Sequence, residues 1–208
     1  MKQKNYNSLC LEKPISNSKT FAYLFKDKQD FYIFFTAFCV ILLDQILKLI
    51  IKFNFYLGEK VKVFDWFYLW FVENNGMAFG IELGGDIGKL FLTLFRVVIV
   101  IVGIHYIRKV KTNYSTGFLI SVGLIVGGAI GNIVDSILYG FCFGYAPLLY
   151  GRVVDMFYFP LIDSYYPSWL PFIGGDHFIF FSPIFNLADA GISVGVFSII
   201  LFFRKELN

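Results

Sequence analysis

Two aspartates lie in settings that disfavour a carboxylate. Asp155 falls in Gly-Arg-Val-Val-Asp-Met-Phe at 151–157, and Asp189 falls in Phe-Asn-Leu-Ala-Asp-Ala-Gly at 185–191. Two carboxylates held close together cannot both ionise cheaply, so one keeps a proton while the other stays charged. Such a pair can activate a water molecule for attack on a peptide carbonyl. If the fold brings Asp155 and Asp189 together, they form an aspartic hydrolase dyad.

Polar side chains also recur at helical spacing inside two apolar runs. Asn132 and Asp135 lie three positions apart, and Asn186 and Asp189 repeat this spacing, so each pair would share one face of a helix. An ionisable group inside a membrane helix is expensive and indicates a functional site. If both faces point into a bundle, the two pairs converge on one polar cluster. A structural hydrogen-bond network would give the same pattern.

The first apolar run contains an acid and a base of its own. Asp44 lies four positions before Lys48, which is the favourable order for an ion pair on a helix. We expect this pair either to neutralise itself near an interface or to take part in the site. In a later run Gly123, Gly127 and Gly131 repeat every four residues, which would let a neighbouring helix pack closely.

Metal and cofactor chemistry has little support in the sequence. The only histidines, His105 and His177, are far apart and form no HExxH pattern. Cys10, Cys39 and Cys142 have no CxxC spacing and cannot all pair within one chain. We therefore expect no metal, no cofactor and no disulfide framework.

The composition is that of a membrane protein. The chain has 208 residues, of which 57% are hydrophobic, 21% aromatic and only 16% charged. Its net charge of +3 is small and its basic residues form no stripe, so nucleic acid is not an expected partner. A membrane helix needs about 20 apolar residues. Four runs meet this length, at residues 31–51, 88–107, 117–138 and 183–203.

The basic residues predict the orientation in the membrane. Lysines are frequent in residues 1–30, and further basic residues occur at 108–111 and in the tail 204–208. Short cytoplasmic loops carry the Lys and Arg excess, so we expect both termini to be cytoplasmic. Residues 1–30 would then be a cytoplasmic extension, and 204–208 a cytoplasmic tail.

Two long connections, 52–87 and 139–182, would lie on the outer side. Residues 61–72 are rich in β-branched and aromatic side chains, which predicts strands of a small sheet. Residues 74–76, Asn-Asn-Gly, predict a turn. The connection 139–182 is rich in aromatic residues and proline, which favours an irregular segment anchored at the membrane interface.

Five short blocks occur in order between residues 31 and 203. They are Asp-Gln at 44–45 with Lys48, Asn-Asn-Gly-Met-Ala-Phe at 74–79, Gly-Gly-Ala-Ile-Gly-Asn-Ile-Val-Asp at 127–135, Val-Val-Asp at 153–155, and Phe-Asn-Leu-Ala-Asp at 185–189. Together they resemble the lipoprotein signal peptidases, also called signal peptidase II, which are bacterial membrane aspartic peptidases.

This resemblance implies a fold and a function. The fold would be an α-helical integral membrane protein, with four transmembrane helices in residues 31–203, a small extracytoplasmic β-sheet (a cradle) and an outer lid-like segment. The function would be an endopeptidase of the bacterial inner membrane, with its active site toward the outer face. It would remove the signal peptide from diacylglyceryl-modified prolipoproteins, cleaving just before the lipid-modified cysteine. Its partners would be these substrates and membrane lipid, and we expect a monomer.

The resemblance also implies roles for individual residues. The catalytic pair falls on Asp155 and Asp189, and the remaining matches form two groups. Substrate-binding roles fall on Asn74, Gly76, Asn132 and Asn186. Supporting roles fall on Asp44, Lys48 and Asp135.

The chain departs from the family pattern at single positions and in the length of two segments. The family usually has Arg directly after the aspartate of the third-helix block, where this chain has Ser136, and Arg152 could replace that cation. The segments 141–150 and 161–181 are longer than usual, which predicts outer loops that change access. Two other functions stay open from the residues: a proton-coupled transporter, and a noncatalytic relative that binds lipid-modified proteins.

Overall fold

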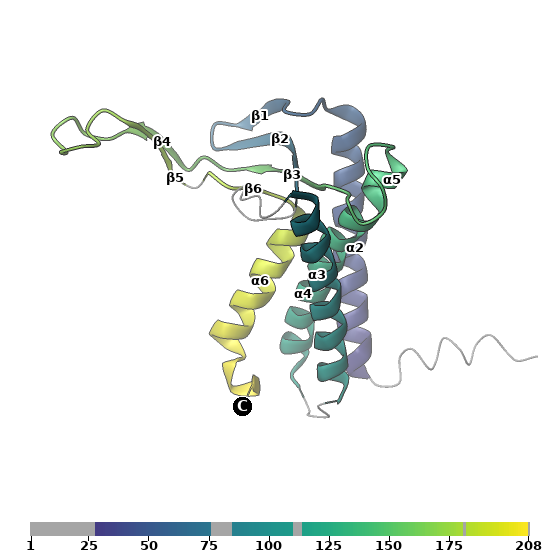
Figure 1. Cartoon of the computed structure of the whole chain (residues 1–208). Coiled ribbons are helices and arrows are strands. Elements are labelled where there is room, and N and C mark those ends of the chain that lie inside the picture. The colour runs from purple at the N-terminus through teal and green to yellow at the C-terminus, as the bar shows by residue number, and fades with distance from the viewer. Residues whose placement is uncertain (1–27, 76–84, 110–113, 181, 208) are drawn as a thin grey trace, which may run out of the picture.

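The computed structural model describes residues 28–75, 85–109, 114–180 and 182–207. In this part of the chain, apolar helices form a bundle that carries a small antiparallel sheet at one end (Figure 1). The longer helices are α2 (Lys28–Asn54), α3 (Gly85–Lys109), α4 (Thr116–Val134) and α6 (Leu187–Phe202). A π-helical turn η2 (Asp135–Tyr139) and the short α5 (Gly140–Cys142) continue α4, and η3 (Arg204–Leu207) follows α6.

The helical membrane class predicted from composition is confirmed. Residues 30–54, 85–107 and 116–142 are long and apolar enough to cross a membrane, with mean hydropathies of 2.1, 2.3 and 2.0. α6 is equally apolar in character but has 16 residues, fewer than the roughly 20 of a full span. The predicted run 183–203 begins too early, because residues 184–185 form a strand and Asn186 caps the helix.

α4 is the central helix of the bundle and packs against both α2 and α6. The predicted close packing through small residues is confirmed: a Cβ atom added to Gly127 would lie 2.8 Å from the Ala37 Cα of α2. On the α6 side, a Cβ atom added to Gly128 would lie 2.2 Å from the Ala188 carbonyl oxygen. Glycine is therefore required at both contacts, because no side chain fits between the helix backbones.

We expect Gly128→Ala to lower the free energy of unfolding by about 1–3 kcal/mol, because its methyl group forces α6 away from α4. The measurement is unfolding in detergent micelles. Gly103→Ala is the matched control, since Gly103 lies inside α3 with no atom within 4 Å of an added Cβ. That change should be neutral or stabilise by up to about 1 kcal/mol. Equal effects of the two substitutions would contradict the packing argument.

The sheet has four strands in the order β1-β2-β3-β6. They are β1 (Lys60–Phe64), β2 (Phe67–Asn74), β3 (Val153–Tyr158) and β6 (Ile184–Phe185). β1 and β2 form a hairpin, which confirms the strands predicted in 61–72, although the chain turns at residues 65–66. β3 lies between β2 and β6 and pairs antiparallel with both.

The prediction of an irregular segment at 139–182 was wrong. This stretch supplies the central strand β3 and a second, two-stranded sheet of β4 (Ile162–Tyr165) and β5 (His177–Phe180). The 161–181 insertion, predicted as a loop, is therefore a hairpin over its described residues, and Figure 1 shows it extending sideways from the bundle. β3 finds its partner on β2, about 80 residues earlier in the chain, so local composition could not reveal the strand.

Candidate active site

Asp155 lies on the central strand of the sheet and is almost completely buried, with 3% of its surface exposed. Both of its carboxylate oxygens accept hydrogen bonds from side-chain amides. Asn186 Nδ2 donates to Oδ1 at 2.7 Å, and Asn74 Nδ2 donates to Oδ2 at 3.2 Å. The strand, the last residue of β2 and the N-cap of α6 together set the orientation of this carboxylate.

Asp189 lies in the first turn of α6 and is half-buried. Asn132 Nδ2 donates to its Oδ1 at 2.7 Å, and the Asn186 backbone N–H donates to its Oδ2 at 3.3 Å. Asn186 in turn accepts from the Asp189 N–H at 2.9 Å, so the two residues form a capping box. The interpretation that Asn186 and Asp189 share one helix face was wrong, because Asn186 precedes the helix with extended backbone.

An amide bridge joins the two aspartates. Asn186 Nδ2 also lies 3.1 Å from Asn132 Oδ1, so the contacts run from Asp155 through Asn186 and Asn132 to Asp189. The structure therefore brings together both acids and all three asparagines that the sequence singled out. Gly76, the other expected substrate-binding residue, lies outside the described residues.

Burial and the neighbouring charge of Asp189 raise the pKa of Asp155 from 3.8 to about 7. The amides of Asn74 and Asn186 and the charge of Lys48 act in the opposite direction but do not offset these two causes. The carboxyl group of Asp155 is therefore partly protonated near neutral pH. A carboxyl group that keeps a proton near neutral pH beside a second carboxyl group is the arrangement used for acid–base chemistry on water.

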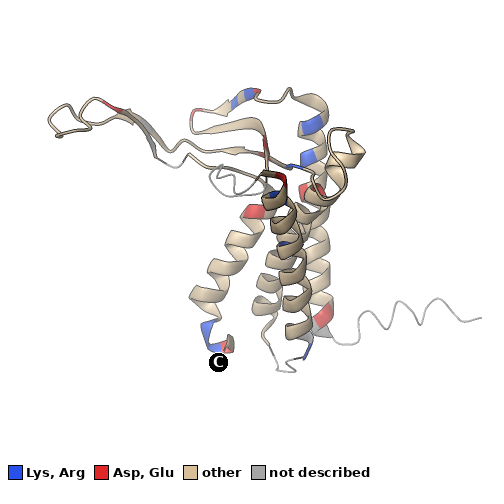
Figure 2. Ribbon diagram, viewed as in Figure 1, with Lys and Arg blue, Asp and Glu red and all other residues tan. Residues whose placement is uncertain are grey.

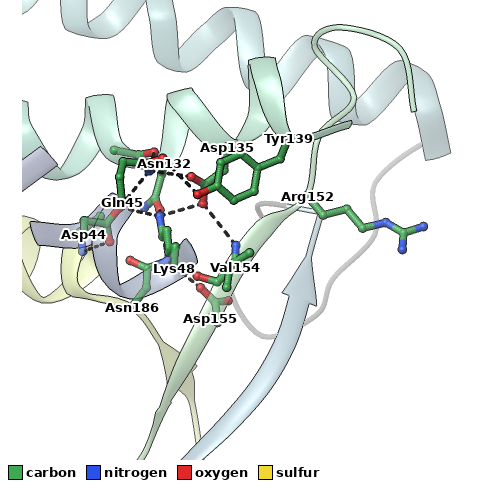
Figure 3. A network of polar contacts seen from close by, with 12 residues as sticks. Asp44, Gln45, Lys48, Asn132, Asp135, Tyr139, Arg152, Val154, Asp155 and Asn186 are labelled. Carbon is green, nitrogen blue, oxygen red and sulfur yellow. Dashed lines mark hydrogen bonds and ion pairs between the residues drawn. The ribbon is translucent and has the colours of Figure 1, made fainter. Parts of the chain in front are cut away.

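A buried lysine lies at the centre of a second set of contacts (Figure 3). Lys48 Nζ lies 2.7 Å from Asp44 Oδ2 and 2.8 Å from Asp135 Oδ2, and all three side chains are fully buried. Lys48 Nζ also donates to Asn132 Oδ1 at 3.0 Å, which links this cluster to the amide bridge. A buried charge is tolerated only when it is paired and hydrogen-bonded, and here each member satisfies the others.

The Lys48 cluster also holds the backbone beside each aspartate. Asp135 Oδ2 accepts from the Val154 N–H at 3.2 Å, directly before Asp155. Asp44 Oδ1 accepts from the Ala188 N–H at 2.9 Å, directly before Asp189. The supporting role implied for these two acids thus has a geometric basis. The sequence could not indicate it, because the donors are backbone N–H groups 19 and 144 residues away.

Two further residues complete the cluster. Gln45 Nε2 donates to Asp135 Oδ1 at 2.8 Å and to the Gly131 carbonyl at 3.2 Å. The Tyr139 hydroxyl donates to Gln45 Oε1 at 3.1 Å. Tyr139 carried no sequence signal beyond its aromatic character. It lies on the π-helical turn η2, which follows Val134 without a break in the helix.

The cations near the two aspartates come from α2 and α3. Arg152, expected to replace the missing arginine, is 48% exposed, lies 3.5 Å from Glu73 and points away from the cluster (Figure 3). Ser136 is fully buried, and its Oγ has no hydrogen-bond partner among the described residues. Arg96 of α3 instead lies close enough to interact electrostatically with both carboxylates, and Lys48 of α2 acts on Asp155. No sequence pattern marks Arg96 as a residue of the site.

The chain is similar to known proteins over most of its length. The family model for signal peptidase (SPase) II matches residues 36–204. A lipoprotein signal peptidase of Porphyromonas gingivalis is 44% identical over 186 residues, covering 81% of each chain. One of Amoebophilus asiaticus is 38% identical over 183 residues, covering 83% of this chain and 77% of its own. A bacterial membrane enzyme structure solved by the in meso method superposes with a TM-score of 0.60 at 26% identity, covering 85% and 89% of the two chains.

Proposed function

Since the chain belongs to the lipoprotein signal peptidase family, we propose that Asp155 and Asp189 are its catalytic pair. The activity is that of signal peptidase II, an aspartic endopeptidase that removes the signal peptide from lipid-modified prolipoproteins. The observation that carries the proposal is the amide bridge through Asn132 and Asn186, which joins the two carboxylates. Asp44, Asp135, Asp155 and Asp189 gather at the sheet end of the bundle, whereas a proton-coupled transporter needs acids along a path across the membrane.

The raised pKa of Asp155 supports the part of the proposal in which this residue holds the starting proton. Ionised Asp189 takes a proton from a bound water, whose oxygen attacks the scissile carbonyl carbon. Protonated Asp155 donates a hydrogen bond to the developing oxyanion. When the peptide bond breaks, a carboxyl proton passes to the leaving amine, so that one water molecule is consumed per bond cleaved.

The three asparagines serve this chemistry by orienting the carboxylates. Asn132 and Asn186 hold Asp189 and Asp155 relative to one another, and Asn74 holds the second oxygen of Asp155. Such fixed geometry lowers the entropic cost of reaching the reactive arrangement. Contact of these amides, and of Gly76, with the substrate peptide is a further part of the proposal.

Turnover is expected to fall as the pH rises above about 7, because protonated Asp155 is the reactive form and its pKa is about 7. Between pH 7 and pH 9 the protonated fraction falls roughly fiftyfold, and cleavage should follow it. The measurement is the pH–rate profile with a diacylglyceryl-modified precursor, using the same precursor without the lipid as a matched substrate control. A rate that stays level up to pH 9 would contradict this proton assignment. Equal cleavage of both precursors would contradict the lipid requirement.

The orientation in the membrane is part of the same proposal. The ends of α3 and α6 that lie opposite the sheet carry basic residues, Lys109 on α3 and Arg204 and Lys205 on η3 (Figure 2). Positive residues favour the cytoplasmic side. The termini would therefore be cytoplasmic, and the sheet and the catalytic pair would lie toward the outer face. We also propose that the enzyme acts as a monomer.

A further inference from the structure

The hairpin of residues 161–180, which we call the arm, is the main part of the connection between β3, which carries Asp155, and β6, which leads to Asp189. Its strands pair with each other over four registered residue pairs, from Ile162 with Phe180 to Tyr165 with His177. Figure 1 shows the arm leaving the bundle at the level of the sheet and running across the direction of the helices. It therefore projects beyond the body that holds the catalytic site.

The surface of the arm is apolar and exposed. Apolar or aromatic side chains at least half exposed are found along its whole length, and they are Leu161, Ile162, Tyr165, Trp169, Phe172 and Phe180. The arm contains two acidic residues, Asp163 and Asp176, and no lysine or arginine. An apolar surface of this kind is unfavourable in water and marks a contact with another apolar phase or partner.

The tip of the arm has a defined conformation. The Gly174 N–H donates to the Leu170 carbonyl, and the Gly175 N–H donates to the Tyr166 carbonyl, each at 3.0 Å. Tyr166 also stacks on Phe178, with ring centroids 4.6 Å apart. The exposed aromatic residues are therefore held on a folded hairpin.

Phe172 is the clearest sign that this surface meets a partner. Its φ angle is 72°, in the left-handed region, which costs a bulky residue about 1–2 kcal/mol. The ring gains no packing against the residues that the structure describes, because it is fully exposed. The tip thus holds one large apolar ring outward at a conformational cost, which is expected where the ring has a contact outside the chain.

We propose that the arm lies in the lipid–water interface at the sheet end of the bundle, with Trp169 and Phe172 inserted into lipid. The exposed apolar surface extends from the arm onto the sheet, where Trp66 is largely exposed and stacks on Phe159, two residues before the arm. Aromatic side chains settle at this depth of a membrane. The inference rests on the helices being membrane spans and is independent of the catalytic assignment.

The absence of basic residues identifies the kind of lipid contact. Without lysine or arginine, the arm has no group that attracts anionic headgroups, so burial of its apolar side chains drives the contact. The arm joins the strand of one catalytic aspartate to the helix of the other. Its insertion would therefore hold both at one depth relative to the lipid of the substrate.

The test is site-directed fluorescence quenching of the full chain in phosphatidylcholine vesicles. In a background with Cys10, Cys39 and Cys142 replaced by serine, Phe172→Cys is labelled with bimane. Quenching is measured with a nitroxide-labelled phospholipid and with aqueous iodide. Two matched positions bracket the result: Phe91→Cys on the exposed surface of the α3 span, and Lys62→Cys on the exposed edge strand β1.

We expect the label at position 172 to be quenched by the nitroxide lipid at least threefold more than the label at 62, and to be shielded from iodide. Iodide quenching equal to that at position 62, without lipid quenching, would overturn the proposal. Shielding from iodide that disappears when the protein is diluted in the vesicles would also overturn it, because a second copy would then cover the arm. Each labelled protein is also assayed for cleavage of the modified precursor. A failure of the proposed membrane contact is therefore distinguishable from a failure of the proposed catalytic assignment.

Discussion

Asp155→Asn is expected to lower cleavage of the modified precursor at least about a hundredfold and to stabilise the fold at pH 8. The loss of activity follows because asparagine cannot deliver a proton, and positioned acid–base groups contribute about 10²–10⁴-fold. The gain in stability follows because the substitution removes a buried carboxyl group whose pKa is raised from 3.8 to about 7. Each pKa unit corresponds to about 1.4 kcal/mol, so the gain is about 2–4 kcal/mol.

The stability effect has a defined pH window. In the unfolded chain the Asp155 carboxyl ionises at its ordinary pKa of 3.8, whereas in the folded protein it holds its proton up to about pH 7. The folded state therefore loses stability as the pH rises between these values, and the loss is complete above about pH 7. Asp155→Asn should consequently raise the unfolding temperature in detergent at pH 8 and leave it nearly unchanged at pH 4.

Two comparisons make this result specific. Asp189→Asn should abolish cleavage to a similar degree, because neither carboxyl group of a coupled pair works alone. Asp65→Asn is the matched control, since Asp65 is 91% exposed in the β1–β2 turn, and it should leave cleavage unchanged. Normal turnover by either Asp155→Asn or Asp189→Asn, at equal protein abundance, would disprove the catalytic pair.

Lys48→Met is expected to destabilise the fold by about 3–5 kcal/mol, because it leaves the buried carboxylates of Asp44 and Asp135 without their cation. Those two acids also accept hydrogen bonds from the backbone N–H groups of Val154 and Ala188. Protein that remains folded should therefore cleave the precursor more slowly, since the backbone beside each catalytic aspartate loses its fixed position. The measurements are the free energy of unfolding in detergent and the turnover of the remaining folded protein.

Removing all three charges together separates charge compensation from packing. The triple variant Asp44→Asn, Lys48→Met and Asp135→Asn leaves no uncompensated charge and should recover most of the lost stability. Lys62→Met, in the exposed pair with Asp65, should change stability by less than about 1 kcal/mol. A Lys48→Met protein within about 1 kcal/mol of the original would show that Lys48 does not hold the cluster together.

The membrane helices could be predicted because spanning a bilayer is a local property of the sequence. The runs 31–51 and 88–107 lie within α2 (Lys28–Asn54) and α3 (Gly85–Lys109), since about 20 consecutive apolar residues suffice to mark a span. The start of α6 was misplaced by a few residues. There, a two-residue strand and the capping asparagine Asn186 override the apolar pattern.

The strands of the long connection 139–182 could not be predicted, because strand pairing is not a local property of the sequence. β3 is a strand because residues of β2 and β6 pair with it. Of these two partners, β2 lies about 80 residues earlier in the chain. Aromatic and proline-rich composition is equally compatible with an irregular segment. The strands of the arm pair with each other within residues 162–180, and there the aromatic and proline-rich composition did not distinguish a hairpin from an irregular segment.

By itself, the sequence determined the class of protein and the residues available for chemistry. Residue types and hydropathy are properties of single positions and short windows, so the apolar spans and the unusual acids Asp155 and Asp189 could be read directly. Only the tertiary structure decided which groups surround each acid. Asp155 is buried beside Asp189 and retains its proton to about pH 7, whereas Asp44 and Asp135 compensate Lys48 and hold the neighbouring backbone. Burial, distance and charge depend on groups that folding brings together from distant parts of the chain, and these quantities support the proposal that Asp155 and Asp189 are catalytic while Asp44 and Asp135 support them.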